Sequence, residues 1–262
     1  MNGVSVRVDT YTQVGDSYLF TFNNIAPDRV GDTIYATLHA TKDGVSYQGK
    51  TSEYSVAQYC YNMLTKSTDD VYAEFRTLLV DLLNYDSVSQ QYTNHNADNL
   101  ANSDLTQTQK NWGTQTEPDL SYTDLDRNFA VVDGADATWS GATLVLQDSV
   151  TIRLILRTES LDGLTVRITD GVNNWTVDAS SMVQYENGKY YLYFKGLHAG
   201  QMRQKVYFTA YRGETAVSNT LQYSIVSYAY SYQSADPAQY PGLAELVKAM
   251  MRYGDAAYAY TN

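Results

Sequence analysis

The chain offers few residues whose types and spacing could perform covalent or metal chemistry. Its three histidines, His39, His95 and His198, lie far apart in the sequence and show no H-x-x-x-H spacing. The sequence also has no motif that would present a serine or cysteine to one of them as a nucleophile. The chain has one cysteine, Cys60, which lies within an apolar helical pattern. A single cysteine excludes an intramolecular disulfide and a thiolate metal cluster. The sequence therefore predicts a protein that is not an enzyme and that has no cofactor and no metal site.

Pairs of acidic residues are the remaining candidates for acid–base chemistry. Glycoside hydrolysis needs two carboxylates at a set separation, and Asp69 with Asp70 or Asp124 with Asp126 would supply them. Both pairs lie in polar segments, where a solvated surface or a helix cap is the more common role. Residues 119–128 (DLSYTDLDRN) alternate acids but lack the glycine and the final glutamate of a calcium loop, so calcium binding stays an open alternative.

Aromatic side chains are the stronger indication of function. The chain has 25 tyrosines but only 6 phenylalanines, and a tyrosine offers a flat apolar face together with a hydroxyl. Sugars present apolar C–H faces ringed by hydroxyls, so exposed aromatic rings flanked by polar side chains can bind them. The alternative interpretation is that tyrosine, which favours strands, serves to build sheets.

The predicted sugar-binding residues lie in polar surroundings or point outward from a strand. Trp112 and Trp139 are the first choices, because both are large and stand among polar neighbours. Trp175 is ranked last, because it shares strand phase with Val177 and would fit a core equally well. The full predicted set is Trp112, Trp139, Trp175, Tyr191, Tyr193, Tyr230, Tyr232 and Tyr240.

The elements that must position these residues occur in two similar copies. Three segments align without gaps on three later segments, in the same order: residues 18–39 on 190–211, 54–63 on 223–232, and 75–94 on 243–262. These blocks contain 13 identical residues, which indicates duplication of one unit.

The periodicity of each block predicts its secondary structure. Tyr18, Phe20 and Phe22 occupy alternate positions, which is the period of a half-buried strand. An apolar stripe with helical spacing, which indicates an amphipathic helix, is formed by Phe75, Leu78, Leu79 and Leu82. The predicted fold class is therefore α+β, with two tandem copies of an antiparallel β-sandwich-like sheet followed by a helical hairpin.

The repeat also sets the expected domain boundaries. We expect a first unit at residues 1–94, a polar linker or strap at 95–140 and a second unit at 141–262. The first unit looks N-terminally truncated, because it has no counterpart of the strand-like runs ATLVLQ and VTIRLILR. The linker contains large apolar residues such as Trp112, which favours an ordered strap over free coil.

Charge and hydropathy limit the partners. The formal net charge of −11 would repel nucleic acid and anionic membrane surfaces. No 18 apolar residues run together, and the start MNGVSVRVDT lacks the pattern of a signal peptide. We therefore expect no nucleic-acid partner and no membrane insertion, and the chain fits a piece of a longer protein.

Several motifs resemble modules of large secreted proteins from gut Clostridia. These motifs are the run YSVAQYCYNMLTKS, the helix EFRTLLVDLLNYDSVSQQY and the tail NADNLANSDLT. Asp86 and Ser87 depart from the usual glycine and alanine, whereas the second copy keeps Gly254. Some such modules belong to dockerin-bearing scaffolds, and the two-lobed arrangement is similar to the starch-binding modules of Ruminococcus amylosome adherence proteins. The resemblance implies a noncatalytic module that holds α-1,4-glucan in a groove between lobes, and it assigns no binding residue.

These patterns favour a carbohydrate-binding module of a secreted or cell-surface bacterial protein, with starch-like α-glucan as the expected polysaccharide. The alternative is a structural or protein-adhesion module, whose partners would be other cell-surface scaffold proteins. The two hypotheses differ in where the aromatic residues lie. A binding module should gather the tryptophans and tyrosines on one exposed groove, and a spacer should distribute them among cores.

Overall fold

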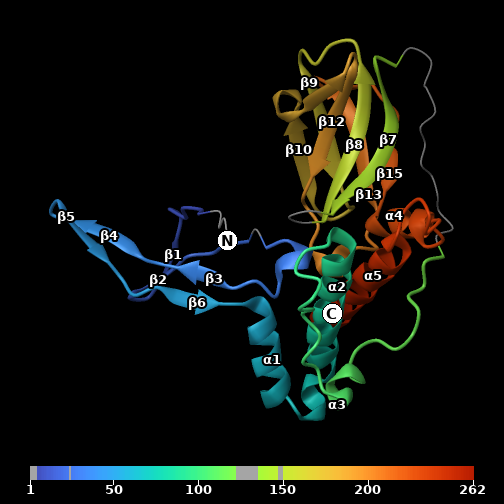
Figure 1. Ribbon diagram of the computed structural model, residues 1–262. Coiled ribbons are helices and arrows are strands. Elements are labelled where there is room, and N and C mark those ends of the chain that lie inside the picture. The colour runs from blue at the N-terminus through green and yellow to red at the C-terminus, as the bar shows by residue number, and fades with distance from the viewer. Residues whose placement is uncertain (1–4, 24, 122–134, 147–149) are drawn as a thin grey trace.

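The computed structural model describes residues 5–23, 25–121, 135–146 and 150–262 (Figure 1). It combines α-helices with antiparallel sheets, which confirms the predicted α+β class. The candidate acids Asp124 and Asp126 lie outside the described residues.

Two antiparallel sheets of the C-terminal half pack against each other (Figure 1). One contains β9 (Leu164–Thr169), β10 (Asn174–Asp178), β13 (Val206–Arg212), β14 (Thr215–Ala216) and β15 (Leu221–Tyr223). The other contains β7 (Ala137–Leu146), β8 (Val150–Thr158), β11 (Val183–Glu186) and β12 (Lys189–Phe194). The first has the order β10-β9-β13-β14, with β15 also paired to β13, and the second has the order β11-β12-β8-β7.

Alternating apolar residues build the core between these sheets. Leu154 on β8 and Val166 on β9 are fully buried, and their neighbours in sequence are more exposed. The rings of Phe194 on β12 and Phe208 on β13 meet edge to face with centroids 5.6 Å apart. The two sheets therefore share one hydrophobic core, as strands with a period of two require.

Helices follow the strands in each half. These are α1 (Val56–Lys66), α2 (Ala73–Thr93) and α3 (Gln107–Lys110), then α4 (Ile225–Tyr232) and α5 (Leu243–Thr261). Ser55 caps α1 and Ser224 caps α4, each accepting a backbone N–H bond from the third residue along. None of the helices in the described ranges has both the length and the apolarity needed to cross a membrane.

The long helices α2 and α5 form the centre of the molecule and run antiparallel (Figure 1). Phe75 at the start of α2 lies against Tyr260 at the end of α5, with ring centroids 5.3 Å apart. Near the middle of both helices, the rings of Tyr85 and Tyr253 stack with centroids 5.9 Å apart. Tyr85 and Tyr253 are aligned positions of the sequence repeat.

The buried side of α2 differs from the predicted stripe. Leu79 of the predicted stripe is buried, but Leu78 and Leu82 are only half-buried. Val80 and Leu83, which lie outside the predicted stripe, are buried as well. This helix packs against α1 on one side and α5 on another. A helix with two partners buries a wider surface than a single amphipathic stripe describes.

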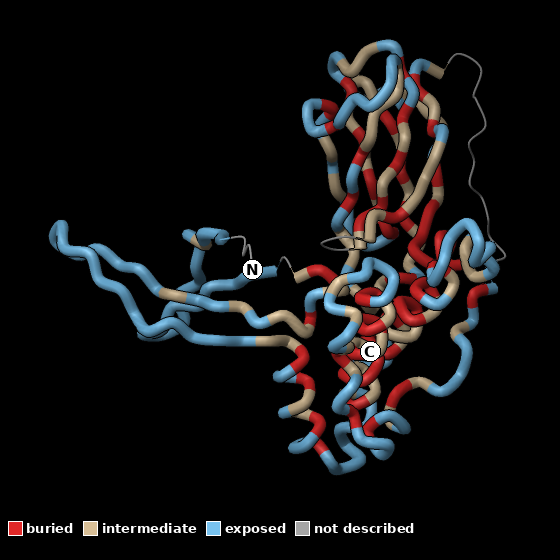
Figure 2. The backbone as a smooth tube through the Cα atoms, viewed as in Figure 1, coloured by how far each residue is buried: buried red, intermediate tan, exposed pale blue. Residues whose placement is uncertain are grey.

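The strands of the N-terminal half form three separate two-stranded ladders, β1-β2, β3-β6 and β4-β5. Their bounds are β1 (Thr12–Val14), β2 (Ser17–Leu19), β3 (Ile34–Ala36), β4 (His39–Lys42), β5 (Val45–Gln48) and β6 (Ser52–Tyr54). We call residues 11–23 and 33–54 the arm. The arm extends away from the helices and is exposed along most of its length (Figure 2). The predicted half-buried strand at residues 18–22 is therefore wrong, because it pairs only as far as Leu19 and is exposed throughout.

Aligned positions nevertheless make matching contacts in the two halves. Ile34 pairs with Tyr54 in the β3-β6 ladder, and the aligned Val206 pairs with Tyr223 in the β13-β15 ladder.

The junction between strands and helices is matched as well. The N–H of Ala57 in α1 donates to Val30 O at 2.9 Å, and the N–H of Val226 in α4 donates to Met202 O at 3.0 Å. Each acceptor follows a short 3₁₀ helix, η1 (Pro27–Arg29) or η4 (Ala199–Gln201). The remaining 3₁₀ helices are η2 (Asp70–Tyr72) and η3 (Ala179–Ser181).

The segment at residues 95–121 crosses from the first half to the second. The buried Asp81 of α2 accepts bonds from the N–H and the hydroxyl of Thr114 at 3.0 and 2.6 Å. Glu117 then pairs with Arg252 of α5 at 2.7 Å. Strand β7 begins at Ala137, so the segment predicted as a linker at 95–140 includes the start of this strand.

The location of the core predicts how phenylalanine truncations should act on stability. Phe208→Ala should lower the free energy of unfolding by about 3–5 kcal/mol, because it opens a cavity between the sheets. The matched control Phe20→Ala, in the exposed arm, should change it by less than about 0.5 kcal/mol. Urea titrations followed by circular dichroism measure both, and equal losses in the two variants would contradict the assigned core.

Candidate functional site

Three tyrosines form a cluster on the outer surface of the β11-β12-β8-β7 sheet, where Tyr185 and Tyr193 are exposed and Tyr191 is half-buried. Leu192 and Phe194 of β12 point into the core, so the alternate residues Tyr191 and Tyr193 point outward. Tyr185 of β11 stacks on Tyr191 with centroids 4.2 Å apart and planes 9° from parallel. Tyr193 meets Tyr191 edge to face at 6.1 Å. We call Tyr185, Tyr191 and Tyr193 the aromatic face.

Cationic side chains flank the aromatic face. The guanidinium carbon of Arg153 on β8 lies 4.7 Å from the centroid of the Tyr191 ring. Lys189 places its ammonium 6.0 Å from the centroid of Tyr185 and 2.5 Å from a carboxylate oxygen of Glu186. The Nε atom of Arg153 is buried and has no hydrogen-bond partner among the described residues. The rings are therefore bordered by hydrogen-bond donors.

A turn signal in the sequence could have identified Tyr185 and Lys189, but not Arg153 on β8. Sequence reasoning named Tyr191 and Tyr193 but not Tyr185, Arg153 or Lys189. Asn187 and Gly188 connect β11 to β12, and Gly188 has a positive φ of 66°. An Asn-Gly pair between two strands predicts a tight hairpin, and a hairpin brings the preceding strand beside β12.

Trp139 is a core residue, so its prediction as an exposed platform is wrong. Only 1% of its surface is exposed. Its ring meets Phe208 edge to face at 6.4 Å, and its Nε1 donates to the carbonyl of Asn219 at 3.1 Å. The polar neighbours that suggested a linker belong to β7, whose alternate side chains enter the core.

The other two tryptophans are also packed rather than open. Trp112 is half-buried against the α1 and α2 helices, and the guanidinium carbon of Arg76 lies 4.8 Å from its ring centroid. Trp175 on β10 is half-buried and meets Phe194 edge to face at 5.0 Å. Neither ring belongs to the aromatic face.

The predicted tyrosines after β15 form a cluster of their own. Tyr232 lies 4.5 Å from Tyr228 and 6.0 Å from Tyr240, measured between ring centroids. Tyr230 and Tyr240 are exposed, whereas burial and the neighbouring Tyr232 raise the pKa of Tyr228 to about 12. Within the described ranges no ring contact joins this cluster to the aromatic face. The predicted binding residues therefore do not converge on one site.

Two cavities in the described part of the chain do not match a polysaccharide site. A cavity of about 10 Å³ lies between α2, α5 and the end of β7, lined by Tyr85, Tyr92 and Leu246 among others. It has space for one water molecule rather than a sugar ring. An open hollow of about 340 Å³ is lined by residues 161–165 and 178–180, with no aromatic side chain. The exposed sheet surface is thus the better candidate than the expected groove between lobes.

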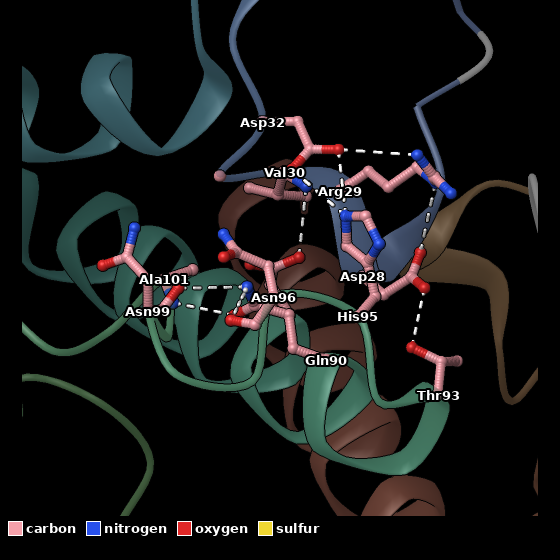
Figure 3. Close-up of polar contacts among 12 residues, drawn as sticks. Asp28, Arg29, Val30, Asp32, Gln90, Thr93, His95, Asn96, Asn99 and Ala101 are labelled. Carbon is pink, nitrogen blue, oxygen red and sulfur yellow. Dashed lines mark hydrogen bonds and ion pairs between the residues drawn. The ribbon is translucent and has the colours of Figure 1, made fainter. Parts of the chain in front are cut away.

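A polar junction holds the base of the arm on α2 (Figure 3). Asp86 accepts a bond from the N–H of Val30 at 3.1 Å, and its second carboxylate oxygen is buried without a hydrogen-bond partner among the described residues. His95 approaches Asp32 at 3.0 Å. Burial is the largest cause that raises the pKa of Asp86 to about 7, and the nearby Asp28 and Asp32 add to it.

The loop that follows α2 is held by one buried amide. Gln90 accepts a bond from the N–H of Ala101 at 2.8 Å and donates to the carbonyls of Asn99 and Asn96 at 3.2 and 3.5 Å (Figure 3). Because each of these bonds goes to backbone atoms of residues 96–101, Gln90 fixes the shape of this turn. The junction and the turn therefore use their polar groups for structure.

The remaining chemically active residues lie apart. Cys60 is fully buried, and burial raises the pKa of its thiol to about 12, so it is unreactive at neutral pH. His39 lies in the exposed β4, and His198 precedes η4. The described part of the chain contains no cluster of three or more His, Cys, Asp or Glu residues that could hold a metal.

Comparison with models of protein families, with curated proteins and with solved structures finds no match for this chain. Its function is therefore inferred from the chemistry of its own surfaces.

The buried Asp86 predicts a pH-dependent stability. Its pKa rises from 3.8 to about 7 on folding, so the folded state binds the proton more tightly. The stability from this group is present below about pH 4 and is lost as the pH rises towards 7. The Asp86→Asn variant avoids that loss. Its melting temperature should therefore rise relative to that of the wild type between pH 5 and 8. The control Asp98→Asn, at an exposed position, should show no such trend. A difference between Asp86→Asn and wild type that stays constant with pH would refute this assignment.

Proposed function

We propose that the chain is a noncatalytic carbohydrate-binding module of a secreted or cell-surface bacterial protein. Polysaccharide binds on the aromatic face, and starch-like α-glucan is the leading ligand. The observation that supports this proposal is the stacking of the exposed Tyr185 on the half-buried Tyr191, which Arg153 borders. A flat ring surface beside hydrogen-bond donors matches the apolar C–H face and the hydroxyls of a sugar.

The aromatic face is held in place before a ligand arrives. Tyr191 is fixed between the ring of Tyr185 and the guanidinium of Arg153, and both neighbours come from paired strands. Residues that are already ordered lose little conformational entropy on binding. Side chains on strands also keep their spacing better than side chains on loops.

The cationic side chains near the rings make acidic polysaccharides a second possible ligand class, which an experiment can distinguish from neutral glucans. Arg153, Arg157 and Lys189 lie on β8 and β12, where Arg157 pairs with Lys189 and Arg153 with Tyr193. A neutral glucan would use these groups as hydrogen-bond donors, so its affinity would depend little on salt. An acidic polysaccharide would bind through charge and weaken as salt screens it.

We also propose that the two halves are diverged copies of one unit, of which the C-terminal half is the complete β-sandwich with its helical hairpin. The matched ladders of Ile34 with Tyr54 and of Val206 with Tyr223 support this origin. A protein-adhesion role is the second candidate function. The apolar arm favours it, because large exposed apolar surfaces mark interaction sites.

Truncation of a stacked ring tests the carbohydrate proposal. Tyr185→Ala removes the exposed ring of the stack. It should lower the affinity for a soluble maltooligosaccharide about ten- to hundredfold, by analogy with the ~1–3 kcal/mol lost per stacked base. Tyr258→Ala, at an exposed position of α5, is the matched control and should bind as the wild type does. Calorimetry at two salt concentrations, with thermal melts of each variant, measures the effect. Wild-type protein that gives no heat with α-glucan would exclude starch, and an equal loss in both variants would exclude this face.

Prolonged incubation tests the noncatalytic part of the proposal. Glu186, the carboxylate beside the rings, is paired with Lys189 at 2.5 Å, whereas glycoside hydrolysis needs two carboxylates flanking the bond. Purified protein should leave maltooligosaccharides intact in a reducing-sugar assay. Reducing ends that persist after repurification, and that a mock preparation lacks, would show the proposal to be wrong.

A further inference from the structure

The arm exposes side chains at positions that are buried in the C-terminal half. The exposed fractions of four aligned pairs, with the arm residue first, are 43% and 1% for Phe20 and Leu192, 39% and 5% for Phe22 and Phe194, 56% and 0% for Leu38 and Ala210, and 51% and 1% for Tyr54 and Tyr223. The same sequence positions thus carry apolar side chains in both halves. They are covered in only one of them.

The C-terminal half shows what covers these positions. Strand β12 pairs along its length with β8, so that Leu192 lies opposite Leu154 and Phe194 opposite Ile152. Strand β7 then pairs with the other edge of β8. In the arm, β2 ends at Leu19, and residues 20–22 pair with no strand in the described part of the chain. In the C-terminal half, β8 pairs with one edge of β12. The equivalent edge at residues 20–22 of the arm is therefore open.

We propose that the arm is an open half-sandwich that binds an apolar pair of antiparallel strands from outside residues 1–262. The strand at the position of β8 would carry apolar side chains at alternate positions, as Ile152, Leu154 and Leu156 do in β8. Its backbone would pair with the open edge at residues 20–22, and its side chains would cover Phe20 and Phe22. Addition of a strand to an open sheet edge is a common mode of peptide recognition. This inference goes beyond carbohydrate binding and does not depend on it.

The chemistry of the arm favours a strand pair over a membrane or a second copy of this chain. An open edge presents backbone N–H and C=O groups at strand spacing, and another strand pairs with them in register whereas a lipid does not. A second copy of the chain would bring another arm with the same strands. Its own β7 and β8 are already paired within its C-terminal sheet.

A synthetic peptide with residues 137–158 of this chain, which span β7 and β8, is the probe. We expect it to bind the full chain in fluorescence anisotropy and to slow hydrogen exchange of the amides at residues 20–22 by at least about tenfold. The control peptide has serine in place of Ile152, Leu154 and Leu156, and it should not bind.

Variants of the full chain locate the binding. The double variant Phe20→Ser with Phe22→Ser should weaken peptide binding at least tenfold with an unchanged melting temperature, because both side chains are exposed. Val45→Ser, in the β4-β5 hairpin, is the matched control and should bind as the wild type does. Three outcomes would overturn the proposal: no binding, binding that the double variant retains, or a dimer in light scattering whose amides at residues 20–22 are protected without peptide.

Discussion

The antiparallel packing of α2 against α5 is the contact on which the rest of the structure depends. The aligned residues Tyr85 and Tyr253 stack at its centre, and Phe75 packs against Tyr260 at one end. Both helices are long and come from different halves, so this contact joins the halves into one body. The strap at residues 95–121 reinforces it, because Glu117 pairs with Arg252 of α5. The sheet pair contacts α5, and the base of the arm contacts α2. These contacts set where the sheet pair and the arm lie.

The contact between strands and long helix differs in chemistry between the two halves, although it involves aligned positions. In the second half, Met202 packs directly on Gly254, where an added Cβ would lie only 2.6 Å from the methionine sulfur. In the first half, Val30 lies over Asp86 and donates its N–H to the carboxylate. A close apolar contact is thus replaced by a buried polar contact. Burial raises the pKa of Asp86, and the N–H of Val30 partly offsets this rise. The base of the arm is therefore fixed firmly even though the arm itself has no core.

Much of the fold could be predicted, because helices and strands leave a local periodic pattern in the sequence. The pattern could not identify the partner of each element. Leu78 and Leu82 have helical spacing but are only half-buried, whereas contact with a second helix buries Val80 and Leu83, which the stripe did not include. For the candidate site, Trp139 stands among polar residues, but its strand places it in the core. Tyr185 gains its role from a neighbour across a hairpin, which residue-by-residue reasoning does not reveal.

The comparison of the halves shows that alternation specifies the side to which a residue points but not whether that side is covered. Phe20 and Leu192 have the same phase, and only Leu192 has a sheet above it. The outward positions have diverged in chemistry as well, because Tyr191 aligns with Leu19 and Tyr193 with Thr21. The aromatic face is therefore specific to the C-terminal half, and the open apolar surface is specific to the arm. The two halves thus carry surfaces of different chemistry, and one helical pair joins them.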